Sequence, residues 1–261
     1  MTVRAAWRGV LLISSLLICF LRFGWIWITA ALRGRRVSLM QRAEWMRFCG
    51  RLVLASMGIH SRVEGELPKG VTVIVANHLS YLDIVIAAAA FPCIFVARHD
   101  VVEWPVFGVL SRLGGTIYLD RASRASAWEA VDMMALRLAE GAPVLFFPEG
   151  TSTDGSQVIR FHSTLFAAAV EAALPVTPAA ISYETCNARS SGMITERDLC
   201  WFGDDLFLPH LLRVLGVTGF TAVVRFGAPE FYPDRRTAAW RSHDAVEAMR
   251  ARSLVNVKLI V

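Results

Sequence analysis

Lysine is almost missing from this chain of 261 residues: Lys69 and Lys258 are its only lysines, and arginine supplies nearly all the positive charge behind a net charge of +5. No basic run interleaved with aromatics occurs, which argues against nucleic acid as a partner. The five cysteines are odd in number and show no C-x-x-C spacing. This pattern argues against a disulfide framework or a zinc site and favours a reducing compartment. No internal repeat or low-complexity linker divides the chain, so its length fits one domain, or one domain with an appendage.

Apolar residues, by contrast, make up 55% of the chain, which is high for a free cytosolic protein and indicates contact with a membrane. Residues 9–32 are apolar apart from Arg22, two serines and a threonine. A helix of that length would cross roughly 30 Å of hydrocarbon. Arg22 costs ~2.5–3.5 kcal/mol on insertion, whereas each Leu, Ile, Val or Phe returns ~0.3–0.6 kcal/mol. The stretch predicts a membrane anchor that spans the bilayer or lies in its interface; the alternative is a buried core helix.

A second helix is predicted from Ser38 to Met57. Ser38 is the expected N-cap, with Gln41 three residues later as its capping-box partner. Two interpretations stay open for this segment: an amphipathic helix at the membrane, or a surface helix packed on the following domain.

Short β-branched runs alternate with helical patterns from Ile59 onward. The predicted strands are Val71–Ala76, Ile94–Ala97, Thr116–Leu119, Val144–Phe147, Val176–Ser182 and Thr221–Phe226. The predicted helices are Tyr81–Ala90, Val106–Leu113, Ala125–Ala139 and Leu165–Ala173, with an apolar helix over Asp205–Leu215 that touches lipid. This alternation predicts an α/β fold with a mixed, largely parallel sheet flanked by helices, preceded by the N-terminal membrane-anchoring helical segment.

His78 stands where the strand Val71–Ala76 gives way to a helix. Open α/β sheets bind their ligands at the carboxyl ends of their strands. Asp83 lies in the first turn of the following helix, from which it can hold the imidazole from behind, so His78 is a candidate general base. The alternative is structural, because Ser80-x-x-Asp83 also fits a capping box and His78 could be a loop residue.

Three further segments stand at predicted strand ends. Arg121 closes one strand, Pro148-Glu149-Gly150-Thr151 follows another, and Leu174-Pro175 opens a third. Each has an ordinary explanation on its own: a surface ion pair, a turn carboxylate, or proline at a sheet edge.

Together, the order and spacing of these segments closely resemble the glycerolipid acyltransferase family that includes bacterial lysophosphatidic acid (1-acyl-sn-glycerol-3-phosphate) acyltransferases. The matching blocks are NHLSYLD, the stretch from Arg98 to Arg121, FPEGTS and LPVTP, and the resemblance covers about residues 61–226. We therefore expect residues 1–58 to form membrane-anchoring helices and residues 59–261 to form an acyltransferase catalytic domain.

The resemblance implies that a lysolipid hydroxyl attacks the thioester of acyl-CoA or acyl-carrier protein, with no cofactor beyond this co-substrate. His78 would remove the hydroxyl proton, and Asp83 would fix the imidazole tautomer. No covalent acyl-enzyme is required, so the absence of a G-x-S-x-G elbow is expected. Backbone N–H groups at the start of the Ser80 helix are candidate donors to the thioester oxyanion.

By the same resemblance, Glu149, Gly150 and Thr151 line the acceptor site and Arg121 binds the acceptor's phosphate, a task that suits a planar guanidinium. Substrate contacts are also expected from Asn77 and Ser80. The expected partners are a lysophospholipid acceptor, the acyl donor and membrane lipids. The expected location is the bacterial inner membrane, with the catalytic domain on the cytoplasmic side.

Basic residues that the family often carries are missing at three positions. Ser152 follows FPEGT where arginine is common, and His162 and Ser163 replace a pair of lysines. The leading hypothesis is formation of phosphatidic acid from 1-acylglycerol 3-phosphate; the missing charges also permit a lyso-ornithine lipid or another lysolipid as acceptor. Outside acyl transfer, His78, Asp83 and Glu149 could form a metal site for ester hydrolysis, or the chain could be a non-catalytic lipid binder.

Overall fold

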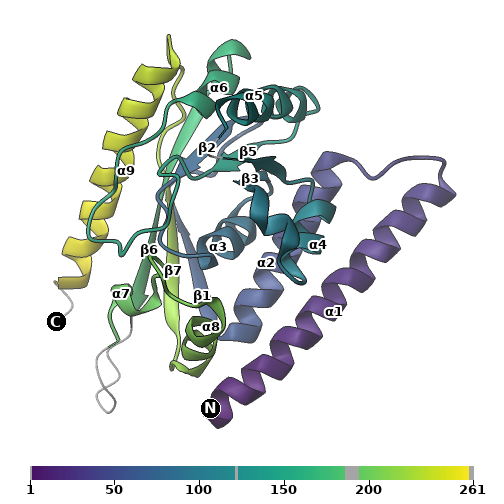
Figure 1. The fold of residues 1–261 in the computed structure, drawn as a ribbon, viewed down its shortest axis with the longest axis vertical. Coiled ribbons are helices and arrows are strands. Elements are labelled where there is room, and N and C mark those ends of the chain that lie inside the picture. Colours follow the sequence, from purple (N-terminus) through teal and green to yellow (C-terminus); the bar gives the residue numbers. More distant parts are fainter. Residues whose placement is uncertain (1, 121–122, 186–193, 259–261) are drawn as a thin grey trace.

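The computed structural model describes residues 2–120, 123–185 and 194–258, the last six of these without their side chains. Its strands form one seven-stranded sheet in the order β1-β7-β6-β2-β5-β3-β4 (Figure 1). The strands are β1 (Ile59–Glu64), β2 (Val73–Ala76), β3 (Ile94–Arg98), β4 (Ile117–Leu119), β5 (Val144–Phe146), β6 (Val176–Thr185) and β7 (Phe220–Phe226). Only β6 and β7 pair antiparallel among these strands. The predicted mixed, largely parallel sheet is confirmed.

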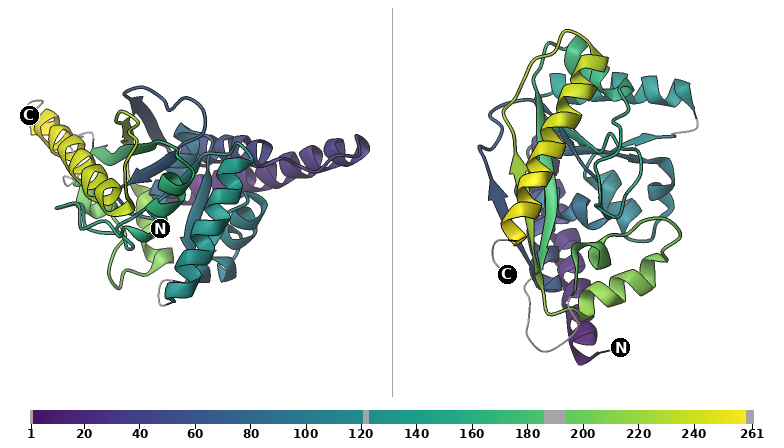
Figure 2. Two further views of the ribbon diagram at one scale, coloured as in Figure 1. Left: turned by 90° about the horizontal axis from the view of Figure 1, so that it is seen from above. Right: turned by 90° about the vertical axis from the view of Figure 1, so that its left-hand side faces the viewer.

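Helices cover both faces of the sheet (Figure 2). The helices and 3₁₀ segments are α1 (Val3–Leu32), α2 (Leu39–Met57), α3 (Leu82–Ala90), η1 (His99–Glu103), α4 (Phe107–Leu113), α5 (Arg124–Ala139), η2 (Thr164–Phe166), α6 (Ala167–Glu171), α7 (Glu196–Leu199), α8 (Phe207–Gly216) and α9 (Arg235–Lys258). Alternate residues of the buried strands point to opposite faces, which separates two cores. Ile74 and Ala76 pack with α2, α3 and α8, whereas Val73 and Val75 pack with α5, α6 and α9.

Besides the short segments η1 and α7, two longer elements were not predicted from the sequence, β1 and α9. β1 pairs with β7 at the edge of the sheet, and most of its residues are exposed or only partly buried, so it lacks the apolar alternation of a half-buried strand. α9 is polar overall, and half of its described buried positions are small, namely Ala238, Ala239 and Ser242. Both elements are stabilised by tertiary packing that local hydropathy does not reveal.

α1 projects from the domain as a long arm (Figures 1 and 2). It is long and apolar enough to cross a bilayer, by length and composition. Its inner face packs on α2 through Trp45, whose indole N–H donates to the carbonyl of Cys19 at 2.9 Å. Near its start, Arg8 donates to the carbonyls of Leu215 and Val217 at the end of α8, at 3.2 and 2.7 Å. The outer face is apolar and exposed along its length at Trp7, Val10, Ile13, Leu17, Leu21, Trp25, Ile28 and Leu32.

α2 packs directly on the sheet domain. The predicted Ser38 cap is confirmed, because the Ser38 hydroxyl accepts from the Gln41 N–H and the Gln41 side chain accepts from the Ser38 N–H. At Gly50, a Cβ atom would lie 2.7 Å from the Ala89 nitrogen and 2.8 Å from the Val85 carbonyl oxygen, so α2 and α3 approach as only glycine permits. Of the two interpretations, the structure shows a helix packed on the domain.

Candidate active site

His78 lies between β2 and α3, at the carboxyl end of the sheet, as the sequence predicts. Its Nδ1 lies 2.8 Å from Asp83 Oδ2, and its side chain is 15% exposed while that of Asp83 is fully buried. The imidazole stacks on the Phe147 ring with 4.2 Å between centroids and 15° between planes. No hydrogen bond within the described residues involves Nε2, so this nitrogen is free to meet a substrate.

Asp83 is held by four donors. Its Oδ2 also accepts the backbone N–H groups of Leu79 and Ser80 at 2.6 and 2.9 Å, and its Oδ1 accepts the Tyr183 hydroxyl at 2.5 Å. The capping interaction and the contact with His78 are therefore made by the same carboxylate. These donors stabilise the charge of a carboxylate that has no contact with water.

The same contacts engage several of the N–H groups expected as oxyanion donors. The N–H groups of Leu79 and Ser80 donate to Asp83, and the N–H of Leu82 points to the Ser80 hydroxyl at 3.3 Å. These three groups stabilise the segment behind His78, and oxyanion binding at the start of α3 stays a prediction.

Glu149 lies behind His78 in a buried turn after β5. Its Oε1 accepts the His78 N–H at 2.8 Å and its Oε2 accepts the Ile159 N–H at 3.3 Å. Burial raises the pKa of Glu149 to about 7, although the two backbone donors oppose this shift. The carboxyl fixes the backbone of His78 from the neighbouring strand.

Gly150 and Thr151 complete this turn; of the three residues expected to line the acceptor site, Thr151 lines the cavity, whereas Glu149 and Gly150 are not among its lining residues. Gly150 adopts φ +76°, and a Cβ there would lie 3.2 Å from His162 Cδ2, so both the backbone and the space favour glycine. Thr151 is exposed, and it lines, with Ser152, the cavity in front of His78.

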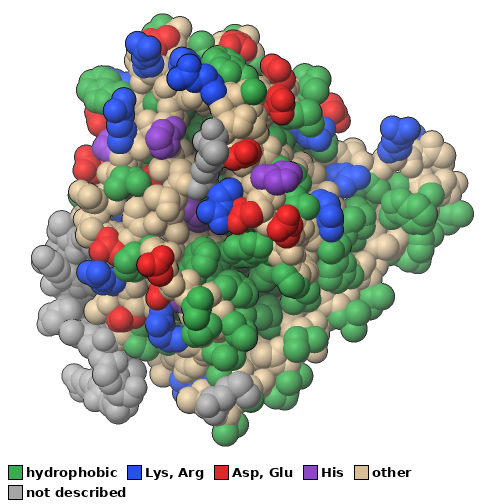
Figure 3. Space-filling view, viewed as in Figure 1, with side chains coloured by type: hydrophobic (Ala, Val, Ile, Leu, Met, Phe, Trp, Pro, Cys, Tyr) green, Lys and Arg blue, Asp and Glu red, His purple; other side chains and the backbone are tan. Residues whose placement is uncertain are grey.

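An apolar cavity of about 330 Å³ opens in front of His78 and extends to the N-terminal helices. Near His78 it is lined by aromatic side chains: Tyr81, Trp104, Phe147, Trp201 and Phe207. Farther away it is lined by Leu12 and Leu16 of α1 and by Met46, Cys49 and Val53 of α2. The space-filling view shows a hollow among hydrophobic side chains, with charged groups above it and the apolar surface of α1 beside it (Figure 3). Its size and lining suit a lipid chain.

The remaining predicted site residues fall into two groups. Asn77 and Ser80 are fully buried and do not line the cavity. The Asn77 carboxamide pairs with both backbone groups of Ile181, at 3.1 and 2.8 Å, and so joins the end of β2 to β6. Arg121 lies outside the described residues, and its assigned role stays a prediction.

Sequence reasoning missed the residues that support the pair from other elements. Phe147 precedes Pro148 in the FPEGT block, but nothing in the sequence reveals its stacking on the imidazole. Tyr183 is separated from Asp83 by 100 residues. The period of two along β6 gives a partial signal, because it puts Tyr183 on the same face as Ile181.

The part of the chain that the structure describes offers no set of donors for a metal centre. Within the described residues, no group of three His, Cys, Asp or Glu side chains is placed to hold a metal ion. Glu149 turns both oxygens to backbone N–H groups, away from the free nitrogen of His78. The geometry of these residues suits proton transfer at Nε2 of His78.

Comparisons with known proteins agree with this geometry. The profile of the Acyltransferase family matches residues 59–182. The chain is 33% identical over 235 residues to a lyso-ornithine lipid O-acyltransferase of Rhizobium meliloti, a match that covers 86% of this chain and 77% of that protein. The chain therefore belongs to the acyltransferase family, and its substrates are a lysolipid and an acyl donor.

Two further proteins define the breadth of this similarity. A 1-acyl-sn-glycerol-3-phosphate acyltransferase of Neisseria meningitidis is 35% identical over 137 residues, which cover 51% of this chain and 53% of that protein. The crystal structure of the acyltransferase PlsC from Thermotoga maritima superposes with a TM-score of 0.67, covering 95% of this chain and 97% of that one at 18% identity. That structure supports the fold. The bacterial lipid acyltransferases and the exposed apolar face of α1 together mark this chain as membrane-associated.

Proposed function

We propose that this protein transfers an acyl group from acyl-CoA or acyl-carrier protein to the free hydroxyl of a lyso-ornithine lipid. The observation that carries the proposal is the His78–Asp83 pair, whose free nitrogen opens on an apolar cavity. Similarity to a lyso-ornithine lipid acyltransferase over most of the chain supports this acceptor. Similarity to the Neisseria glycerophosphate enzyme extends over about half of the chain.

The charges at the cavity also support a headgroup without phosphate. An ornithine headgroup carries a carboxylate and an ammonium. Arg98 lines the cavity and is hydrogen-bonded to Asp100, so this pair adds no net positive charge to the rim. Ser152 lies on the cavity wall at the position where an arginine would meet a phosphate.

In the proposed mechanism, Nε2 of neutral His78 removes the proton of the acceptor hydroxyl as its oxygen attacks the thioester carbonyl. Asp83 holds the proton on Nδ1 and stabilises the imidazolium that forms. When the tetrahedral intermediate collapses, the carbon–sulfur bond breaks and the thiolate recovers the proton from Nε2. His78 therefore ends the cycle neutral, and no acyl group is bonded to the protein.

The proposed oxyanion donors come from the turn after Glu149. The backbone N–H groups of Thr151 and Ser152 make no hydrogen bond within the described residues, and both residues line the cavity with His78. Gly150 supplies the left-handed turn that presents them. Preorganised backbone donors of this kind stabilise charge that develops on a carbonyl oxygen.

We assign the apolar cavity to an acyl chain and the outer face of α1 to the membrane interface. The first two thirds of α1 pack on α2 and α8 through residues such as Arg8 and Cys19, so this part of the helix lies against the domain before the arm projects from it. Leu206, just before α8, and Leu208 and Leu212 within it are also exposed and add to the apolar surface. A lipid chain can then enter the cavity directly from the interface.

The proposed location of the protein is the inner membrane, with the catalytic domain on the cytoplasmic side. Protease added to membrane vesicles tests this orientation: it should cleave the catalytic domain in inside-out vesicles but not in right-side-out vesicles.

Acceptor competition tests the function. Purified protein in detergent is given labelled acyl-CoA or acyl-carrier protein, with lyso-ornithine lipid and lysophosphatidate in parallel and His78→Ala as the blank. We expect transfer to the ornithine lipid to exceed transfer to lysophosphatidate by at least about tenfold in kcat/KM, the scale of one well-placed charged contact.

One variant sharpens this test. Ser152→Arg should improve kcat/KM for lysophosphatidate, because it adds a guanidinium to the cavity wall. If the wild-type protein prefers lysophosphatidate, the proposed acceptor is wrong, but the proposed acyl-transfer reaction stands. Failure of His78-dependent transfer to every acceptor would overturn the function.

A further inference from the structure

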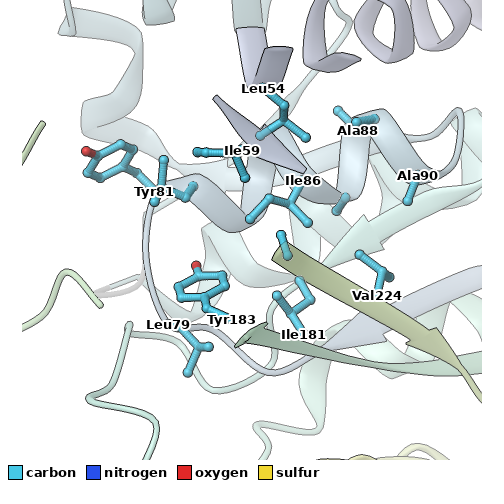
Figure 4. Close-up of a cluster of buried hydrophobic side chains, with 14 of the residues drawn as sticks. Leu54, Ile59, Leu79, Tyr81, Ile86, Ala88, Ala90, Ile181, Tyr183 and Val224 are labelled. Carbon is cyan, nitrogen blue, oxygen red and sulfur yellow. The ribbon is translucent and has the colours of Figure 1, made fainter. Parts of the chain in front are cut away.

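Tyr183 approaches the active site from the far side of Asp83. It lies near the end of β6, is 3% exposed, and packs its ring against Phe220 with 5.3 Å between centroids. In the close-up, the Tyr183 ring rises from β6 with its hydroxyl directed toward α3, and the Leu79 side chain lies on the opposite side of the ring (Figure 4). It donates to Asp83 Oδ1 at 2.5 Å.

This hydroxyl completes the hydrogen bonding of the buried carboxylate. Asp83 Oδ2 accepts from His78, Leu79 and Ser80, all within one short segment of the chain. Tyr183 is the only donor to Oδ1 among the described residues. With both oxygens fixed by different elements, the carboxylate cannot rotate away from the imidazole, and no buried acceptor is left unpaired.

The hydroxyl keeps its proton throughout the working pH range. Burial raises the pKa of Tyr183 well above its usual value, and the adjacent Asp83 carboxylate raises it further. The phenol therefore acts as a fixed donor that exchanges no proton with substrate.

A second layer of contacts holds Tyr183 itself in place. Its backbone N–H donates to Glu196 Oε1 at 2.8 Å, and Glu196 is paired with Arg250 of α9 at 2.7 Å. Arg250 is 4% exposed, and it also donates to the carbonyls of Ile181 and Gly155, at 3.1 and 2.7 Å. The C-terminal helix thus braces both β6 and the loop that follows the FPEGT block.

We infer that Tyr183 is a positioning residue for acyl transfer, which holds the Asp83 carboxylate in the orientation that fixes the Nδ1–H tautomer of His78. The inference rests on the proposed function, in which neutral Nε2 is the base. Tyr183 lies one residue beyond the family match over residues 59–182, so no motif of that match assigns it a role. Tyr183 touches no reacting atom, and its effect reaches the substrate only through Asp83 and His78.

Tyr183→Phe tests the inference, because it removes the hydroxyl and keeps the buried ring. We expect kcat to fall between about 10-fold and 100-fold, the range seen when partners behind a site's direct ligands are lost, while KM for both substrates stays unchanged. Tyr232→Phe is the matched control, since Tyr232 is half-buried in the core on the opposite face of the sheet and should keep wild-type kcat. Far-UV circular dichroism checks that both variants are folded.

A double-mutant cycle with Asp83→Asn separates positioning from general support of the fold. If Tyr183 acts through Asp83, Tyr183→Phe causes no further loss of kcat in the Asp83→Asn background. An equal loss in both backgrounds would overturn the inference, as would kcat within twofold of wild type in Tyr183→Phe alone.

A readout independent of turnover distinguishes failure of this inference from failure of the proposed function. Diethyl pyrocarbonate acylates neutral imidazole, and peptide mass spectrometry follows His78 separately from the exposed His60. We expect modification of His78 to slow in both Tyr183→Phe and Asp83→Asn, with His60 unchanged. Equal rates at His78 in wild type and Tyr183→Phe would overturn the positioning role even where no acyl acceptor is found.

Discussion

The two sides of the His78 imidazole differ as sharply as any two regions of this protein. Behind Nδ1 lies the buried Asp83 carboxylate, whose oxygens together accept four donors from β6 and from the turn that holds His78. In front of Nε2 lies an apolar cavity lined by side chains from α1, α2, α3 and α8. The polar side fixes the orientation of the His78 imidazole and stabilises the charge that forms on it. The apolar side supplies space for a lipid chain and excludes water. A base for a lipid hydroxyl requires both properties.

Loss of the polar side should have the largest effect. Asp83→Asn keeps the shape of the side chain but replaces one carboxylate oxygen with an amide N–H₂ group. This group faces hydrogen-bond donors, and it favours the His78 tautomer that carries its proton on Nε2. We expect kcat to fall by about 10³-fold or more, as in other carboxylate-oriented histidines. The measurement is steady-state transfer to lyso-ornithine lipid.

Asp132→Asn serves as the control for this change, because Asp132 is exposed on α5. It should keep wild-type activity. A loss of less than tenfold in a folded Asp83→Asn protein would mean that the Asp83 carboxylate is structural only.

A change on the apolar side should alter selectivity and leave the chemistry intact. Val85 lines the cavity from α3, and Val85→Phe narrows it. We expect the preferred acyl chain to shorten, with kcat/KM for long chains falling about tenfold relative to short ones, since each excluded methylene costs ~1–3 kcal/mol. The measurement is competition between acyl donors of different chain length.

Val10→Phe provides the matched comparison, because Val10 is exposed on the outer face of α1 and does not line the cavity. Its chain-length profile should equal that of wild type. An unchanged chain-length profile in Val85→Phe would contradict the assignment of the cavity to the acyl chain.

The smallest effect concerns stability and Glu149. Burial raises the pKa of Glu149 to about 7 from an ordinary value near 4.5, so the folded protein binds this proton more tightly than the unfolded chain. Its contribution to stability is therefore complete below about pH 4.5 and is lost as the pH rises to about 7. Glu149→Gln removes this titration. As the pH rises from 5 to 7.5, the melting temperature of the variant should therefore increase relative to that of the wild type.

Thermal unfolding at several pH values measures this difference. The control is Glu66→Gln, because the Glu66 side chain is 92% exposed and should give a constant offset. A constant offset for Glu149→Gln as well would mean that Glu149 is ionised throughout this range.

The sequence predicts the site residues that belong to short local motifs better than the residues that come from distant segments. The NHLSYLD and FPEGT blocks are local, so His78, Asp83 and Glu149 could be assigned from a strand end, a helix start and a resemblance. The partners of the N–H groups just before α3 could not be assigned from the sequence. These groups suit an oxyanion or a carboxylate equally until the position of Asp83 is known. Tyr183 and Arg250 could not be assigned either, since they reach Asp83 only through pairings between distant segments.

The fold shows the same division. Buried strands such as β2 and β5 are continuous apolar runs and were predicted to within two residues. The edge strand β1 and the polar helix α9 depend on neighbours that supply most of their buried surface, and no periodicity in their own sequences identifies them.

The most direct test of the central claim compares acyl transfer by wild-type protein and His78→Ala under identical conditions. If neutral His78 removes the acceptor proton, the variant loses at least about 10²-fold in kcat while remaining folded and membrane-bound. Activity near that of wild type in His78→Ala would contradict the account.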